Sequence, residues 1–275
     1  MLAKLLKYEI KATARLFLPL YLALLLFAFI NRVVNPFKTS KLTGNFNIQA
    51  TISTISAIIY FALIVGIVVM TLIILIQRFY KNLLGDEGYL MFTLPVKTWQ
   101  LIASKLLSAL MWVVLSFTAV LTSVFILIGL GEVFSHLPLI IRTIKTFTGS
   151  TILCIIPFYA LVVAASNIIM IYTAISLGHL FERHKILASF GMYAVLYLVN
   201  QIISALMVVP LINAVIVPNN SIGFLQPPKL GMPVVFPSPS NLNIFILSVA
   251  FILIVLSACY LILINYILNK KLNLD

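Results

Sequence analysis

Residues 51–77 read TISTISAIIYFALIVGIVVMTLIILIQ and contain no Asp, Glu, Lys, Arg or His. A helix of about 20 apolar residues is long enough to cross a hydrocarbon core of about 30 Å. Similar runs recur along the chain, so that 63% of its 275 residues are hydrophobic and only 9% are charged. A soluble domain has about 25% charged residues. The sequence therefore predicts an all-α polytopic membrane protein, most of whose surface contacts lipid.

The apolar runs predict six transmembrane helices within a single transmembrane domain that covers residues 1–275. Their expected bounds are about 16–33, 51–77, 101–130, 149–180, 186–216 and 242–268. Residues 217–241, between the last two helices, hold six of the twelve prolines. No continuous helix accommodates so many prolines, because each lacks a backbone N–H. We expect an extracellular or re-entrant loop there.

The first 15 residues, MLAKLLKYEIKATAR, place leucines and an isoleucine near one helical face and four basic side chains near another. This pattern is typical of an amphipathic helix that lies in the membrane interface. The alternative is a cleaved signal peptide, because a basic start precedes the apolar run at 16–30. The long basic part and the lack of a small-x-small cleavage site favour the retained interfacial helix.

The net charge of +12 arises from 18 Lys and Arg against 6 Asp and Glu. These basic residues concentrate at the expected helix ends and in loops, where they contact lipid headgroups and set orientation, so nucleic acid is not an expected partner. Twelve of them fall on the side of the two termini and six on the other side. Because basic residues are in excess on the cytoplasmic side, we expect both termini and the 78–100 loop to be cytoplasmic in a plasma-membrane protein.

The chain lacks the common catalytic motifs. It has no Gly-Lys dipeptide, and hence no phosphate-binding loop, and it has neither H-E-x-x-H nor G-x-S-x-G. We expect no enzyme activity, catalytic residue, metal or cofactor in this chain. The acidic residues fall in expected loops or near helix ends, which argues against a carrier driven by a proton or sodium gradient. They are Glu9, Asp86, Glu87, Glu132, Glu182 and Asp275.

The 78–100 loop contains a candidate docking helix. Gly85 can end the preceding helix, and Asp86 and Glu87 then stand at the start of a new one, where acidic residues are favoured. Apolar residues follow as far as Pro95, which disfavours helical geometry at Leu94. A short helix with acids at its head and large apolar side chains suits a groove in a partner protein. The alternative is a solvated loop whose apolar residues enter the headgroup region.

Two stretches, GDEGYLMFTLPVKTWQLIASKLLSAL at 85–110 and SLGHLFERHKILASF at 176–190, resemble permease subunits of bacterial type-2 ATP-binding-cassette (ABC) exporters. The order of an amphipathic helix, six spans and a long loop before the last span is also similar. The resemblance implies a cytoplasmic coupling helix between spans 2 and 3 that docks on a separate ABC ATPase subunit, which binds ATP and Mg²⁺. It also implies a second permease subunit, in a homodimer or a heterodimer. The implied docking residues are Asp86, Glu87, Gly88, Tyr89, Leu90 and Met91.

Four amide side chains inside the fourth and fifth expected spans are further candidates: Asn167, Asn200, Gln201 and Asn213. Interhelical hydrogen bonding is the favoured interpretation, and contact with a transported compound is the other. Together these features predict the membrane-spanning permease subunit of an ATP-driven exporter for efflux. The alternatives are a membrane scaffold or sensor subunit that transports nothing, and a gradient-driven secondary carrier.

Overall fold

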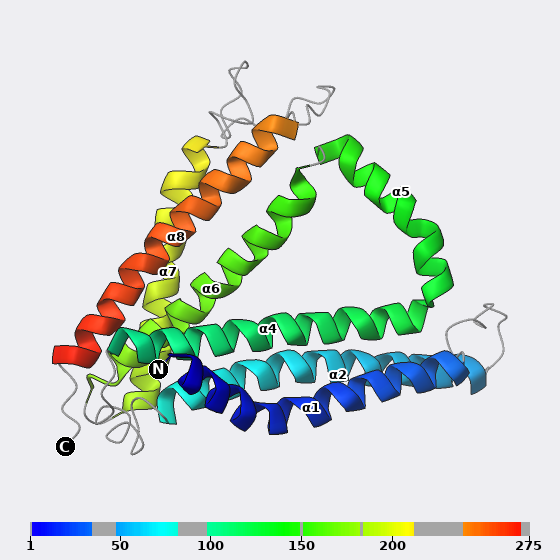
Figure 1. The fold of residues 1–275 in the computed structure, drawn as a ribbon, viewed down its shortest axis with the longest axis horizontal. Helices are drawn as coiled ribbons and strands as arrows, with labels where there is room; N and C mark the ends of the chain where they lie inside the picture. Colours follow the sequence, from blue (N-terminus) through cyan, green and yellow to red (C-terminus); the bar gives the residue numbers. More distant parts are fainter. Residues whose placement is uncertain are drawn as a thin grey trace. The chain divides into compact units, whose positions relative to one another are not determined.

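A computed structural model describes residues 2–34, 48–81, 98–148, 151–181, 184–211 and 239–270 (Figure 1). These residues form seven α-helices and no strand. The helices are α1 (Leu2–Val34), α2 (Ile48–Phe79), α4 (Thr98–Ile128), α5 (Leu130–Thr148), α6 (Ile152–Gly178), α7 (Lys185–Leu211) and α8 (Pro239–Lys270). The all-α prediction is confirmed over this part of the chain.

Six of these helices are long and apolar enough to cross a membrane. They agree with the six spans expected from the hydrophobic runs, which indicates a multi-pass membrane protein. The candidate spans are Leu6–Val33, Thr54–Phe79, Thr98–Ile128, Ile152–Gly178, Lys185–Val208 and Asn241–Asn269. The proline-rich segment at 217–241 lies outside the described residues except for its last three, which begin α8.

The first helix is longer than expected. An interfacial helix over 1–15 and a separate span over 16–33 were expected, whereas α1 continues from Leu2 to Val34 without a break. The candidate span within it begins at Leu6. The interfacial position of its first turns therefore stays a prediction, and the backbone marks no boundary near residue 15.

Residues 131–148 lie between the expected third and fourth spans, where no helix was expected from the sequence, and here the structure differs. Residues Leu130–Thr148 form the helix α5, with Glu132 in its first turn, where a negative charge is favourable. Pro138 lies inside this unbroken helix, and almost all of its described side chains are exposed. Gly129 separates α5 from α4 with a φ of +104°, a backbone conformation that favours glycine.

The chain divides into two compact units, Met1–Pro138 and Leu139–Asp275. In the first unit, α1 packs along α4, and α2 contacts both of them (Figure 1). Their core contains the stacked rings of Phe17 and Trp112, whose centroids lie 4.4 Å apart. The other buried members of this core are Tyr21, Leu24, Ile67 and Ile74.

Hydroxyl groups also join the three helices of the first unit, at the edge of the ring core and beyond it. The Tyr21 hydroxyl on α1 lies 2.6 Å from Ser116 Oγ on α4, and Thr71 Oγ1 on α2 lies 3.0 Å from the same oxygen. Further along, the Tyr60 hydroxyl on α2 lies 2.8 Å from Ser123 Oγ on α4. Because a hydrogen bond is directional, these pairs fix the rotation and the register of each helix, which apolar packing alone fixes less tightly.

In the second unit, α7 and α8 both pack against α6. The connection from α6 to α7 is tight because Gly178, the last residue of α6, lies directly against the backbone of Ser189 on α7. A Cβ atom at Gly178 would collide with the backbone nitrogen and Cα of Ser189. The close approach of these two helices therefore requires a glycine at this position.

We predict that Gly178→Ala destabilises the second unit by about 1–3 kcal/mol, the usual effect of overpacking. Gly191→Ala is the matched control, because nothing lies within 4 Å of the added methyl group on α7. Thermal unfolding of both full-length variants in detergent measures the difference. Equal unfolding temperatures for the two variants would contradict the close packing at Gly178.

Candidate functional site

The implied docking residues, Asp86 to Met91, lie outside the described residues, as does Asn213. The helices on either side of this docking segment are described, since α2 ends at Phe79 and α4 begins at Thr98. The ends of these two helices are therefore the nearest parts of the structure at which a site can be sought.

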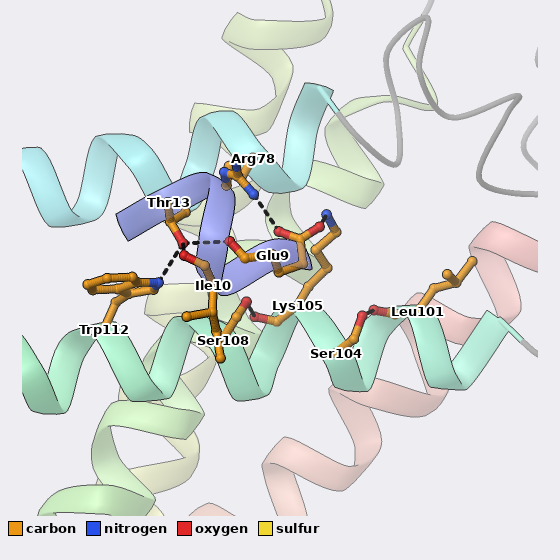
Figure 2. Close-up of polar contacts among 9 residues, drawn as sticks. All are labelled: Glu9, Ile10, Thr13, Arg78, Leu101, Ser104, Lys105, Ser108 and Trp112. Atoms are coloured by element: carbon orange, nitrogen blue, oxygen red, sulfur yellow. Dashed lines mark hydrogen bonds and ion pairs between the residues drawn. The ribbon is translucent and has the colours of Figure 1, made fainter. Parts of the chain in front are cut away.

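A buried ion cluster joins these two helix ends to α1. The Glu9 carboxylate on α1 accepts a hydrogen bond from Arg78 on α2, with 2.6 Å between Nη1 and Oε2. Its other oxygen, Oε1, accepts a hydrogen bond from the ammonium group of Lys105 on α4. Figure 2 shows Arg78 and Lys105 reaching the carboxylate from two different helices. We call Glu9, Arg78 and Lys105 the ion cluster.

The ion cluster is shielded from solvent. Glu9 is 8% exposed and Lys105 is 4% exposed, whereas the Arg78 side chain is 25% exposed. Removing a charge from water costs several kcal/mol, and an oppositely charged partner with good hydrogen-bond geometry offsets much of that cost.

A second layer of contacts holds Glu9 in place. Thr13, one turn further along α1, donates its hydroxyl proton to the Glu9 backbone carbonyl at 2.7 Å. The same hydroxyl oxygen accepts a hydrogen bond from Trp112 Nε1 on α4, also at 2.7 Å (Figure 2). Trp112 in turn stacks on Phe17. The ion cluster and the aromatic core of the first unit are therefore directly connected.

The burial of Glu9 corrects one expectation from the sequence. Glu9 was assigned to a helix end outside the spans, whereas it lies inside the candidate span Leu6–Val33 and is buried. The sequence contains a pattern that indicates this burial. Glu9 follows Leu5 by four residues and Leu6 by three, so it shares their apolar helical face. Its pairing with two cations is the arrangement of a structural ion cluster.

Two of the polar residues predicted within the spans, Asn167 on α6 and Asn200 on α7, line the same small pocket. Asn167 donates its amide to the Val163 carbonyl of its own helix at 2.8 Å, so this bond is not interhelical. Next to it, Ser166 and Ser257 join α6 to α8 at 2.8 Å. Gln201 is exposed and is not among the residues that line the pocket.

Over the described part of the chain, no three His, Cys, Asp or Glu side chains gather where they could share a metal ion. The helices and the ion cluster define a class, a multi-pass membrane protein whose first three described helices are fastened by buried charges at one end. Comparison of the chain with protein-family models, curated proteins and solved structures gives no match.

We predict that Glu9→Gln lowers the free energy of unfolding of the full-length protein by about 3–5 kcal/mol, because the substitution removes a buried carboxylate charge that faces the Lys105 ammonium. Lys105→Met is also expected to destabilise the protein, and the double variant is expected to lose much less than the sum of the two. Such non-additivity is typical of residues in one ion network. Thermal or denaturant unfolding in detergent measures all three variants.

Glu132→Gln on α5 is the matched control, because its side chain is exposed. Loss of an exposed acid from the first turn of a helix costs about 0.3–1 kcal/mol, well below the effect expected of Glu9→Gln. Strictly additive effects of Glu9→Gln and Lys105→Met would show that the two side chains do not depend on each other.

Proposed function

We propose that this chain is the membrane-spanning permease subunit of an ATP-driven exporter, in which separate ABC ATPase subunits bind and hydrolyse ATP. The observation that carries the proposal is the position of the ion cluster. Arg78 is the penultimate residue of α2, and Lys105 lies two turns into α4, so Glu9 binds both helices that flank the docking segment. A displacement of that segment by a partner is passed to α1, α2 and α4 together.

The first unit is well suited to move as one body. Besides the ion cluster, Tyr21 and Thr71 both bond Ser116, and the Ser56 hydroxyl on α2 donates to Asn31 Oδ1 on α1 at 2.5 Å. Polar contacts thus join the three helices near both ends and in the middle. A packed and hydrogen-bonded helix group responds to a force at one end by rotation or translation of the whole group.

In the proposed mechanism, the force that moves the three helices comes from separate ATPase subunits. ATP binding closes two cytoplasmic ATPase subunits and moves the segment at 85–94, and the three fastened helices follow. Two permease subunits then alternate access to a path between them. The support for a separate ATPase is the resemblance of residues 85–110 to ABC permeases and the lack of a phosphate-binding loop in the sequence.

We predict that Asp86→Ala combined with Glu87→Ala weakens binding of the ATPase subunit by at least about tenfold, because both acids head the proposed docking helix. A tenfold change corresponds to about 1.4 kcal/mol of binding free energy. The measurement is co-purification of an ATPase with the tagged full-length chain from its native membrane, together with the ATP hydrolysis rate of the purified complex. Membrane insertion is expected to stay intact.

Glu132→Ala is the matched control, since it also removes an acid but lies on α5. Co-purification unchanged by the double variant, or no ATPase with the unaltered chain, would contradict the proposal. Vesicle transport with and without ATP separates the alternatives. A scaffold or sensor subunit moves nothing in either condition, and a gradient-driven carrier works without ATP.

Glu9→Gln tests the transmission of force separately from docking. This variant is expected to retain the ATPase during purification and to reduce ATP-driven transport several-fold, because α1 is then fastened less tightly to α2 and α4 at the end nearest the docking segment. Loss of the ATPase together with transport would instead assign Glu9 to docking. Transport equal to that of the unaltered chain would show that the ion cluster carries no force.

A further inference from the structure

The second unit contains a pocket of about 40 Å³ among α6, α7 and α8. Its polar lining comes from all three helices, and the remaining lining residues are apolar. No charged side chain lines it. The polar residues are Ser166 and Asn167 on α6, Asn200 on α7, and Ser257 and Tyr260 on α8.

The Tyr260 hydroxyl shows that this pocket is more than a packing defect. The hydroxyl oxygen is buried and has no hydrogen-bond partner among the residues that the structure describes. A buried polar group left in this condition costs about 1–3 kcal/mol. Tyr260 is among the residues that line the pocket, and the pocket is the space beside it in which a bound group would supply the bond.

The other polar walls offer both acceptors and donors. Asn167 uses one amide hydrogen on the Val163 carbonyl, and its side-chain oxygen is an acceptor. Ser166 and Ser257 contact each other at 2.8 Å and each also lies within hydrogen-bond distance of a carbonyl of its own helix. Two hydroxyl protons are thus shared among three contacts, and lone pairs remain on the serine oxygens.

The pocket lies at membrane depth, where a bound polar group stabilises the polar side chains around it. Asn167, Asn200 and Tyr260 each lie at least eight residues from the ends of their candidate spans. No bulk water reaches the lipid-facing surface at such depth, so polar groups there must find partners inside the protein. The neutral lining disfavours an ion, which would be desolvated without an opposite charge.

We propose that this pocket binds one small neutral group that both donates and accepts hydrogen bonds, either a water molecule or the hydroxyl group of a compound dissolved in the membrane. The volume exceeds the roughly 10–15 Å³ that a cavity needs to hold a water molecule. Two to four polar partners are the usual number for such a water, and Tyr260 with Asn167 and Asn200 supplies that number. The site does not depend on the proposed exporter function.

Solid-state NMR of the full-length protein in lipid bilayers tests the proposal, with ¹³Cζ-labelled tyrosine and magnetisation transferred from water protons. Tyr260→Phe assigns the Tyr260 signal and keeps the ring. We expect that signal to build up several-fold faster than the signal of Tyr197, which is 52% exposed on α7 and is assigned by Tyr197→Phe. Build-up at Tyr260 no faster than at Tyr197 would overturn the site.

Addition of octan-1-ol, with octane at equal membrane concentration as the control, separates the two sources. Transfer to Tyr260 that both additives leave unchanged assigns the site to water. Transfer that octan-1-ol lowers and octane does not shows that a membrane-dissolved hydroxyl compound displaces the water. Either result supports the pocket as a binding site.

A matched pair of variants tests whether the pocket itself holds the bound group. Asn167→Leu removes one polar wall and is expected to slow the transfer to Tyr260 several-fold. Gln201→Leu makes the same kind of change at a residue that, like Asn167, is exposed but does not line the pocket, and it is expected to leave the transfer unchanged. Equal transfer in the two variants would overturn the proposal.

Discussion

The Glu9 carboxylate is a buried negative charge near the start of α1, and the first unit is arranged to compensate it. Two helices each contribute a cation, Arg78 from α2 and Lys105 from α4. Together with the other contacts between α1 and α4, this pairing fixes the two helices parallel to each other, with a nearly constant sequence separation between contacting residues. The contacts of Glu9 with Lys105 and of Tyr21 with Ser116 span 96 and 95 residues of sequence, respectively. At the far end, Arg32 donates to the Leu127 carbonyl across 95 residues, so the same register holds along the full length of α1.

This register gives the first unit a mechanical character that apolar packing alone does not give. Apolar side chains are attracted in proportion to buried area and allow neighbouring helices to slide or rotate by small amounts. Hydrogen bonds and ion pairs require particular distances and directions, so each one removes such freedom. The helices that flank the docking segment are the ones that the ion cluster fastens. A partner that pushes on that segment therefore meets three connected helices, and this property is the physical basis of the proposed coupling.

The second unit uses its polar residues in a different way. Gly178 allows α6 and α7 to approach closely, and the serine pair Ser166 and Ser257 joins α6 to α8. Asn167, Asn200 and Tyr260 line a small neutral pocket, and the Tyr260 hydroxyl has no partner among the described residues. A unit with strong ion pairs is suited to transmit force, whereas a neutral polar pocket at membrane depth is suited to bind a small uncharged group. The two units thus differ in the chemistry that each places inside the bilayer.

The sequence by itself determined the six apolar helices, because the length and hydrophobicity of a run are local properties that do not depend on the rest of the chain. It missed α5, since polar residues and Pro138 conceal its helical character and almost no described side chain of α5 is buried. It named Asn167 and Asn200 as polar residues in spans, but only tertiary structure brought them to one pocket with Tyr260. The burial of Glu9 likewise required the folded bundle. Arg78 and Lys105 lie 69 and 96 residues away from Glu9 in the sequence. A local sequence pattern does not show which cations will lie beside a given carboxylate after the helices pack.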